Sequence, residues 1–98
     1  MNKLATVLFL TVLGVAPAMA QPPPPPGPPP LRNEAVPPPP GATYRWEPGH
    51  WHWNGVTYVW VPGHYFVPRP GYGAHWVPGH WRWSPRLGRY VWEPAHWG

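Results

Sequence analysis

A repeat in the second half of the chain constrains its fold more than any other feature. Four segments share the pattern Trp-x-Pro-Gly-His-aromatic, and their leading residues Trp46, Trp60, Trp76 and Trp92 are spaced 14, 16 and 16 residues apart. In the last copy, Ala95 replaces the glycine. Repetition at a short period is typical of a chain built from one supersecondary unit used several times.

The repeat contains turn signals. Pro followed by Gly suits the centre of a type II turn, because proline presets the first φ and glycine accepts a positive second φ. Asn-Gly is a two-residue hairpin signal. We therefore predict hairpins at Pro48-Gly49, Asn54-Gly55 and Pro62-Gly63. The predicted cross-strand partners are Trp46 with Trp51, Tyr44 with Trp53, Trp53 with Val56, Trp51 with Tyr58, Trp60 with Tyr65, and Tyr58 with Val67.

The predicted fold class is mainly β: a meander of short antiparallel strands built from the four repeats. Strand side chains alternate with a period of two, so the aromatic residues fall on one face. Arg45, His52, Thr57 and Val59 fall on the other. A single sheet of this size has nothing to cover its aromatic face. We expect the meander to curl into a small barrel-like sandwich, or to be covered by a second copy or a partner, and we predict self-association or docking to an envelope protein.

Residues 1–20 have the layout of a secretory signal. Lys3 is followed by an apolar run over residues 4–15 and by small residues at Ala18 and Ala20. The run is shorter than the about 20 apolar residues that cross a bilayer. We predict cleavage after Ala20, export, and no transmembrane span in the mature chain. The chain has no cysteine, which excludes disulfides and a cysteine-linked lipid anchor.

Residues 21–40 are dominated by proline, which fixes φ and removes the backbone donor. We predict a disordered arm of polyproline II character, with flexible joints at Gly27 and over residues 31–36. One interpretation is a semi-rigid spacer. The alternative is a ligand for a domain with an aromatic groove. The predicted organisation is therefore a signal peptide over 1–20, the arm over 21–40, and a Trp-rich β-repeat domain over 41–98.

The composition argues against catalysis. The mature chain has no Lys, Asp or Cys, and Ser84 is its one serine, so a nucleophile with a base and an orienting group is nearly unbuildable. Glu47 and Glu93 occupy equivalent repeat positions, which favours repetition over a catalytic pair. Six Arg against three Glu give the mature chain a net charge of +3, but these Arg are scattered, and we expect no nucleic-acid partner.

The histidines are candidate metal ligands. Four of them follow Pro-Gly or Pro-Ala in the same register, and a fifth lies two residues beyond the first of these on the same predicted strand. Imidazole is a common ligand for zinc, copper and nickel, so the one cofactor that the sequence suggests is a divalent transition metal. The alternative is that each in-register histidine closes the turn and packs on neighbouring tryptophans, since the spacing matches no compact zinc ligand set. The candidates are His50, His52, His64, His80 and His96.

The aromatic face is the other candidate site. Sugar rings stack on Trp and Tyr, so a glycan is one candidate ligand. The alternative is that these side chains form the core or a self-association surface, since large apolar patches mark contact sites. The candidate face consists of Trp46, Trp51, Trp53, Tyr58, Trp60, Trp76, Trp81, Trp83 and Trp92.

The segments 44–53, 58–67, 74–83 and 90–97 resemble the WXXGXW (YXWGXW) repeat proteins of Gram-negative bacteria, in which a Trp, a Gly and an aromatic recur as in Trp46-Glu47-Pro48-Gly49-His50-Trp51. The resemblance covers nearly all of residues 44–97. It implies a small exported envelope protein and supplies no catalytic residues. We predict a structural or interaction module of the periplasm or outer membrane. Several such proteins are lipoproteins, whereas this chain lacks the cysteine that a lipid anchor requires.

Overall fold

The computed structural model describes residues 21–98, so the predicted signal peptide and its cleavage residues Ala18 and Ala20 lie outside the described residues. Residues 21–98 contain short β-strands and no helix, which confirms the mainly β fold class. The part of the chain that the structure describes has no helix with the length and hydrophobicity needed to cross a bilayer. The strands are β1 (Arg45–Glu47), β2 (His50–Trp53), β3 (Tyr58–Val61), β4 (His64–Phe66), β5 (Trp76–Val77), β6 (His80–Ser84), β7 (Arg89–Glu93) and β8 (His96–Trp97).

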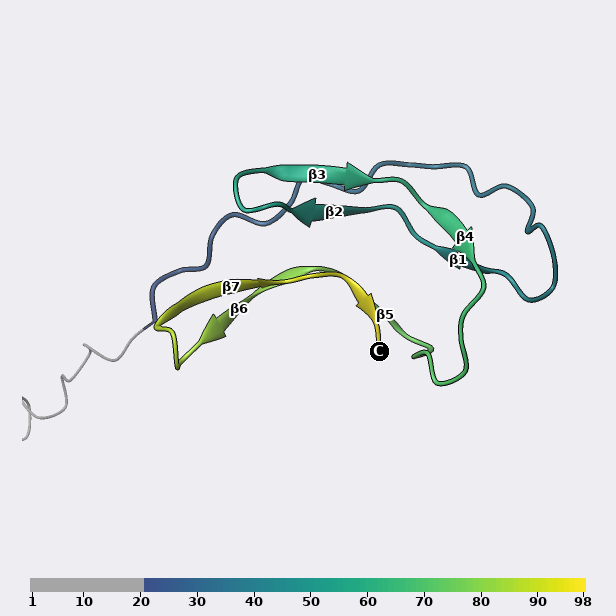
Figure 1. Ribbon diagram of the computed structural model, residues 1–98. Helices are drawn as coiled ribbons and strands as arrows, with labels where there is room; N and C mark the ends of the chain where they lie inside the picture. Colours follow the sequence, from purple (N-terminus) through teal and green to yellow (C-terminus); the bar gives the residue numbers. More distant parts are fainter. Residues whose placement is uncertain (1–20) are drawn as a thin grey trace, which may run out of the picture.

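The strands form two long antiparallel hairpins, each interrupted halfway along its length (Figure 1). In the first hairpin (residues 45–66), β2 pairs with β3 near the turn, and β1 pairs with β4 farther away. The second hairpin (residues 76–97) repeats this arrangement, with β6 paired to β7 and β5 to β8. Each hairpin therefore contains two copies of the sequence repeat, one on each side.

The Pro-Gly steps are not the turns of these hairpins. Glu47 pairs with His64 and His50 pairs with Val61, so Pro48-Gly49 lies opposite Pro62-Gly63. We call this place the first crossing, and the equivalent place of Pro78-Gly79 and Pro94-Ala95 the second crossing. Proline cannot donate to a ladder, which explains why pairing stops at both crossings. The glycines with positive φ in the described part are Gly55, Gly71 and Gly88, so no repeat glycine occupies the second central position of a type II turn. The predicted hairpins at Pro48-Gly49 and Pro62-Gly63 are wrong.

Asn54-Gly55 does form a turn, with a longer loop than predicted. Trp53 pairs with Tyr58, and Trp51 pairs with Trp60, so the register is displaced from the predicted one. The side-chain oxygen of Asn54 accepts hydrogen bonds from the backbone N–H groups of Val56 and Thr57, both at 2.9 Å. These bonds stabilise a four-residue loop, as Asx turns do.

The second hairpin turns after Ser84. The Gly88 N–H donates to the Ser84 carbonyl at 2.8 Å, and the Ser84 hydroxyl accepts from the Leu87 N–H at 3.2 Å. Gly88 has a φ of 66°, a conformation that glycine adopts without strain. Ser84 is 8% exposed and is the one buried residue in the described part of the chain.

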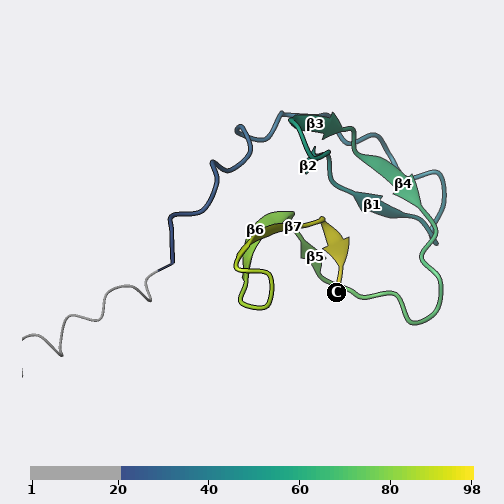
Figure 2. The ribbon, with the colours of Figure 1, turned by 60° about the vertical axis from the view of Figure 1, so that its left-hand side comes forward.

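The two hairpins fold over one another, so the meander supplies part of its own second layer (Figure 2). Trp53 contacts Trp81 with ring centroids 5.5 Å apart, and Tyr58 contacts Trp92 at 5.7 Å. No hydrophobic side chain among residues 21–98 is buried. The interior is a set of half-buried aromatic rings, which is typical of a domain too small to enclose a core.

The arm, residues 21–40, has no helix or strand, as its prolines predict. It differs from a free spacer because it lies along the first hairpin, as the blue trace beside β2 and β3 in Figure 1 shows. Residues 31–36, predicted as a flexible joint, contain Glu34, which is hydrogen-bonded to Trp60 and Gly63.

Candidate binding surface

The aromatic residues of the first hairpin form a ladder of cross-strand pairs. All three pairs are T-shaped, a geometry that aromatic quadrupoles favour. The ring centroids are 5.0 Å apart for Trp46 and Tyr65, 5.1 Å for Trp51 and Trp60, and 5.0 Å for Trp53 and Tyr58. The prediction that these side chains share one face is confirmed, although their partners differ from the predicted ones.

This face holds the arm through aromatic donors. Polyproline II backbone has no internal hydrogen bonds, so its carbonyl groups are free to accept. Each donor is a tyrosine hydroxyl or an indole N–H, and each acceptor is a proline carbonyl. The pairs are Tyr65 with Pro37, Trp51 with Pro30 at 3.1 Å, Tyr58 with Pro26 at 2.6 Å, and Tyr90 of the second hairpin with Pro22 at 2.8 Å.

Two charged residues of the arm also contact the ladder. Glu34 accepts from the Trp60 indole N–H at 3.1 Å and from the Gly63 backbone N–H at 3.0 Å. The guanidinium carbon of Arg32 lies 5.1 Å from the ring centroid of Trp51 and 5.5 Å from that of Trp60, within cation–π distance. Nearly every residue of the arm is exposed, so these polar contacts, more than burial, hold it in place.

The crossings explain the glycine of the repeat. A Cβ on Gly63 would overlap the ring of Trp46, and a Cβ on Gly49 would lie 2.5 Å from the ring of Trp60. A Cβ on Gly79 would overlap the ring of Trp92. Each glycine therefore permits the leading tryptophan of the paired repeat to lie directly on the backbone.

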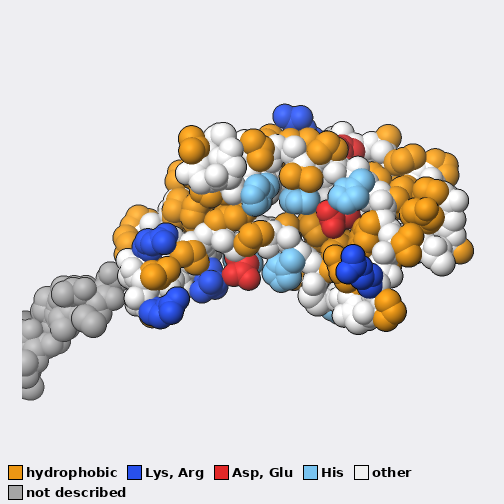
Figure 3. Space-filling model, in the orientation of Figure 1, with side chains coloured by type: hydrophobic (Ala, Val, Ile, Leu, Met, Phe, Trp, Pro, Cys, Tyr) orange, Lys and Arg blue, Asp and Glu red, His pale blue; other side chains and the backbone are white. Residues whose placement is uncertain are grey.

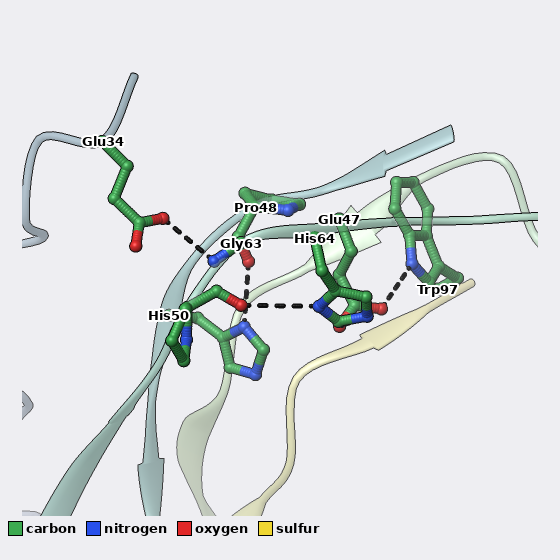
Figure 4. Close-up of polar contacts among 8 residues, drawn as sticks. Glu34, Glu47, Pro48, His50, Gly63, His64 and Trp97 are labelled. Atoms are coloured by element: carbon green, nitrogen blue, oxygen red, sulfur yellow. Dashed lines mark hydrogen bonds and ion pairs between the residues drawn. The ribbon is translucent and has the colours of Figure 1, made fainter. Parts of the chain in front are cut away.

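The in-register histidines share one local contact. In each, Nδ1 lies near the carbonyl of the proline two residues earlier: His50 with Pro48 at 3.0 Å, His64 with Pro62 at 3.4 Å, His80 with Pro78 at 2.9 Å, and His96 with Pro94 at 2.9 Å. Because a carbonyl only accepts, Nδ1 carries the proton and donates. Figure 4 shows the two histidines of the first crossing in this arrangement.

The histidines do not form a metal cluster. Within residues 21–98, no three His, Cys, Asp or Glu side chains come close enough together to hold a metal ion. His50 packs against Trp76 with ring centroids 5.0 Å apart, and His64 Nε2 lies 3.5 Å from Glu47 Oε2. His52 lies opposite Val59 in the sheet. Histidine side chains are spread over the middle of the face shown in Figure 3, among hydrophobic ones.

The second hairpin has the same ladder, with pairs between Trp76 and Trp97, Trp81 and Trp92, and Trp83 and Tyr90. The first hairpin contacts this ladder. The Trp97 indole N–H donates to Glu47 at 3.1 Å, as Figure 4 shows, and the Trp81 indole N–H donates to the Tyr58 hydroxyl at 3.0 Å. The Trp92 indole nitrogen is buried and has no hydrogen-bond partner.

The polar face of the second hairpin carries an ion pair. Arg82 Nε donates to Glu93 Oε2 at 2.9 Å. This hydrogen bond lowers the pKa of Glu93 below its ordinary value. The side chains of Arg82 and Glu93 are 55% and 34% exposed, so solvent screens the pair and it contributes little to stability.

Of the nine aromatic candidates, Trp51, Tyr58 and Trp60 contact the arm. The candidate list omitted four further residues that contact or complete the surface, although Tyr65 was predicted to lie opposite Trp60: Arg32, Glu34, Tyr65 and Tyr90. A signal for them was present. Tyrosine and tryptophan donors in one part of a chain match the unpaired carbonyls of a proline-rich segment in another.

In a comparison with protein families, the family described as WXXGXW repeat (2 copies) matches the chain over residues 43–64, 55–72 and 75–97. These matches include every strand of both hairpins. Searches among curated proteins and among solved structures gave no match.

Proposed function

The chain belongs to the WXXGXW repeat family, and we propose that it is an exported, non-catalytic interaction module whose aromatic face binds extended proline-rich segments. One observation carries this proposal: aromatic side chains from both hairpins donate hydrogen bonds to four proline carbonyls of the arm. Domains that recognise polyproline II helices use the same chemistry, with aromatic side chains against a preformed extended backbone. The arm is thus the ligand that the chain itself provides.

The arm offers a direct test, because trypsin can cut after Arg32. Cleavage requires the arm to leave the aromatic face, so its rate reports the docked population. We expect mature chain (residues 21–98) to be cut at this bond at least about tenfold more slowly than a free peptide of residues 21–40, since several hydrogen bonds of about 1 kcal/mol each must break. Mass spectrometry of the digest measures both rates.

Tyrosine variants identify the donors. Tyr65→Phe combined with Tyr90→Phe removes two hydroxyls that bond to the arm, and we expect cleavage after Arg32 to accelerate about tenfold. Tyr72→Phe is the matched control, because Tyr72 is 50% exposed and contacts Phe66. Equal cleavage of the mature chain and the free peptide would show that the face does not hold the arm, and the proposal would fail.

Export is the second part of the proposal, supported by the sequence of residues 1–20. Expression of the full chain in a Gram-negative host should give a protein that begins at Gln21 in the envelope fraction. Replacing Ala18 and Ala20 by Phe should leave an uncut precursor, because the signal peptidase requires small residues there. Intact-mass measurement decides the matter, and a full-length protein in the cytoplasm would contradict export.

A further inference from the structure

The carboxylate of Glu34 has an unusual position for an arm that is otherwise held by its backbone carbonyls. One oxygen accepts from the Trp60 indole N–H at 3.1 Å, and the other accepts from the Gly63 N–H at 3.0 Å. Glu34 is the only acidic residue of the arm. Figure 4 shows it reaching from the arm to the first crossing.

The first crossing is shaped for this group. Its strand pairing is interrupted by two prolines, which leaves the Gly63 N–H free to point at a ligand. A Cβ on Gly49 would overlap a Glu34 oxygen, and one on Gly63 would come within 3.0 Å of it, so both glycines are needed to admit the carboxylate. Arg32, which belongs to the arm itself, lies over the rings of Trp51 and Trp60, so the docked segment also contacts these two tryptophans through a cation.

The second crossing supplies a comparison within the same molecule. Trp92 is the counterpart of Trp60 and Ala95 the counterpart of Gly63, so the glycine that admits the carboxylate is replaced. The Trp92 N–H is buried and lacks an acceptor. The other two glutamates are engaged elsewhere, Glu47 with Trp97 and Glu93 with Arg82. The tryptophan N–H of the first crossing therefore has a carboxylate acceptor, whereas the equivalent N–H of the second crossing has none.

We propose that the first crossing is a carboxylate-binding site that selects which proline-rich segment docks on the aromatic face. This inference rests on the proposed function and names its ligand, which is an extended proline-rich segment that contains a glutamate. The glutamate lies four and eight residues after two prolines whose carbonyls accept hydrogen bonds from the face, and three residues before a third such proline. Pro30, Pro26 and Pro37 have this spacing around Glu34. The carbonyl contacts accept any polyproline II backbone, whereas the carboxylate contact sets the register and distinguishes one segment from another.

The first test uses the mature chain and cleavage after Arg32, with each rate divided by that of the free peptide of the same sequence. Hydrogen bonds to a charged group are stronger than neutral ones, so Glu34→Gln should accelerate cleavage at least about tenfold. Trp60→Phe removes one of the two donors and should also accelerate cleavage. The double variant should accelerate cleavage by less than the product of the two single effects, because both changes remove the same contact. Tyr72→Phe is again the matched control, since Tyr72 packs against Phe66 and not in the ladder that bonds to the arm.

The second test adds the ligand from outside. A labelled peptide of residues 21–40 and its Glu34→Gln form are titrated into mature chain carrying Glu34→Ala, and anisotropy is measured. The native peptide should bind at least about tenfold more tightly than the Gln form. Equal affinities, no binding of either peptide, or unchanged protection in Glu34→Gln would each overturn the carboxylate site. If the carboxylate site is overturned but the arm of the unaltered chain is protected in the cleavage assay, the proposed binding of proline-rich segments still stands. If that arm is not protected, the carboxylate site and the proposed function are both wrong.

Discussion

Gly79→Ala should lower the free energy of unfolding of the mature chain by about 1–3 kcal/mol, the usual cost of forcing an added methyl group into a packed site. The new Cβ would overlap the ring of Trp92. That ring is held between Trp81 and Tyr58, with centroids 5.4 and 5.7 Å away, so it has little room to move. Urea unfolding followed by tryptophan fluorescence measures the change.

Gly27→Ala is the matched control for this substitution. A Cβ at Gly27 would meet no atom within 4 Å, and its φ is not in the left-handed region. Its effect should stay within about 0.5 kcal/mol. If Gly79→Ala is as mild as the control, close packing of tryptophan on the repeat glycine is not what stabilises the hairpin.

Trp60→Ala should be the most damaging single substitution in the first hairpin, with a loss of about 2–3 kcal/mol. Truncating a buried Trp to Ala costs about 3–5 kcal/mol, and the half-buried position of Trp60 reduces this value. Its ring packs against Trp51 at 5.1 Å and covers Gly49, and its N–H bonds to Glu34. The variant should therefore also release the arm, seen as rapid cleavage after Arg32.

Val59→Ala tests whether this loss is specific. Val59 precedes Trp60 on β3, points to the opposite face, and is 39% exposed. We expect a change within about 0.5 kcal/mol and an arm that remains protected. A loss below about 1 kcal/mol for Trp60→Ala, or a protected arm in that variant, would contradict a central role for this tryptophan.

The wrong hairpins have a physical explanation. Pro-Gly suits the centre of a turn, but it equally suits a break in a strand, because proline lacks a donor and glycine permits a close neighbour. Pairing residues 45–53 with 58–66 around Asn54-Gly55 places the two breaks opposite each other and sets Trp46 on Gly63. Turn propensity is a property of four residues, whereas this packing depends on residues 17 apart.

The sequence by itself determined the mainly β fold, the repeat, the shared aromatic face and the absence of helix or strand in the arm. Period-two alternation places Trp51 with Trp53, and Tyr58 with Trp60, on one face, and the missing N–H of proline excludes helix and strand from the arm. Tertiary structure alone decided which signals are turns, and where the arm lies. Proline fixes the conformation of the arm, but its position depends on donors at Trp51, Tyr58 and Tyr90, which lie 21, 32 and 68 residues from their acceptors. Only the folded hairpins bring these groups to the carbonyls that they bind.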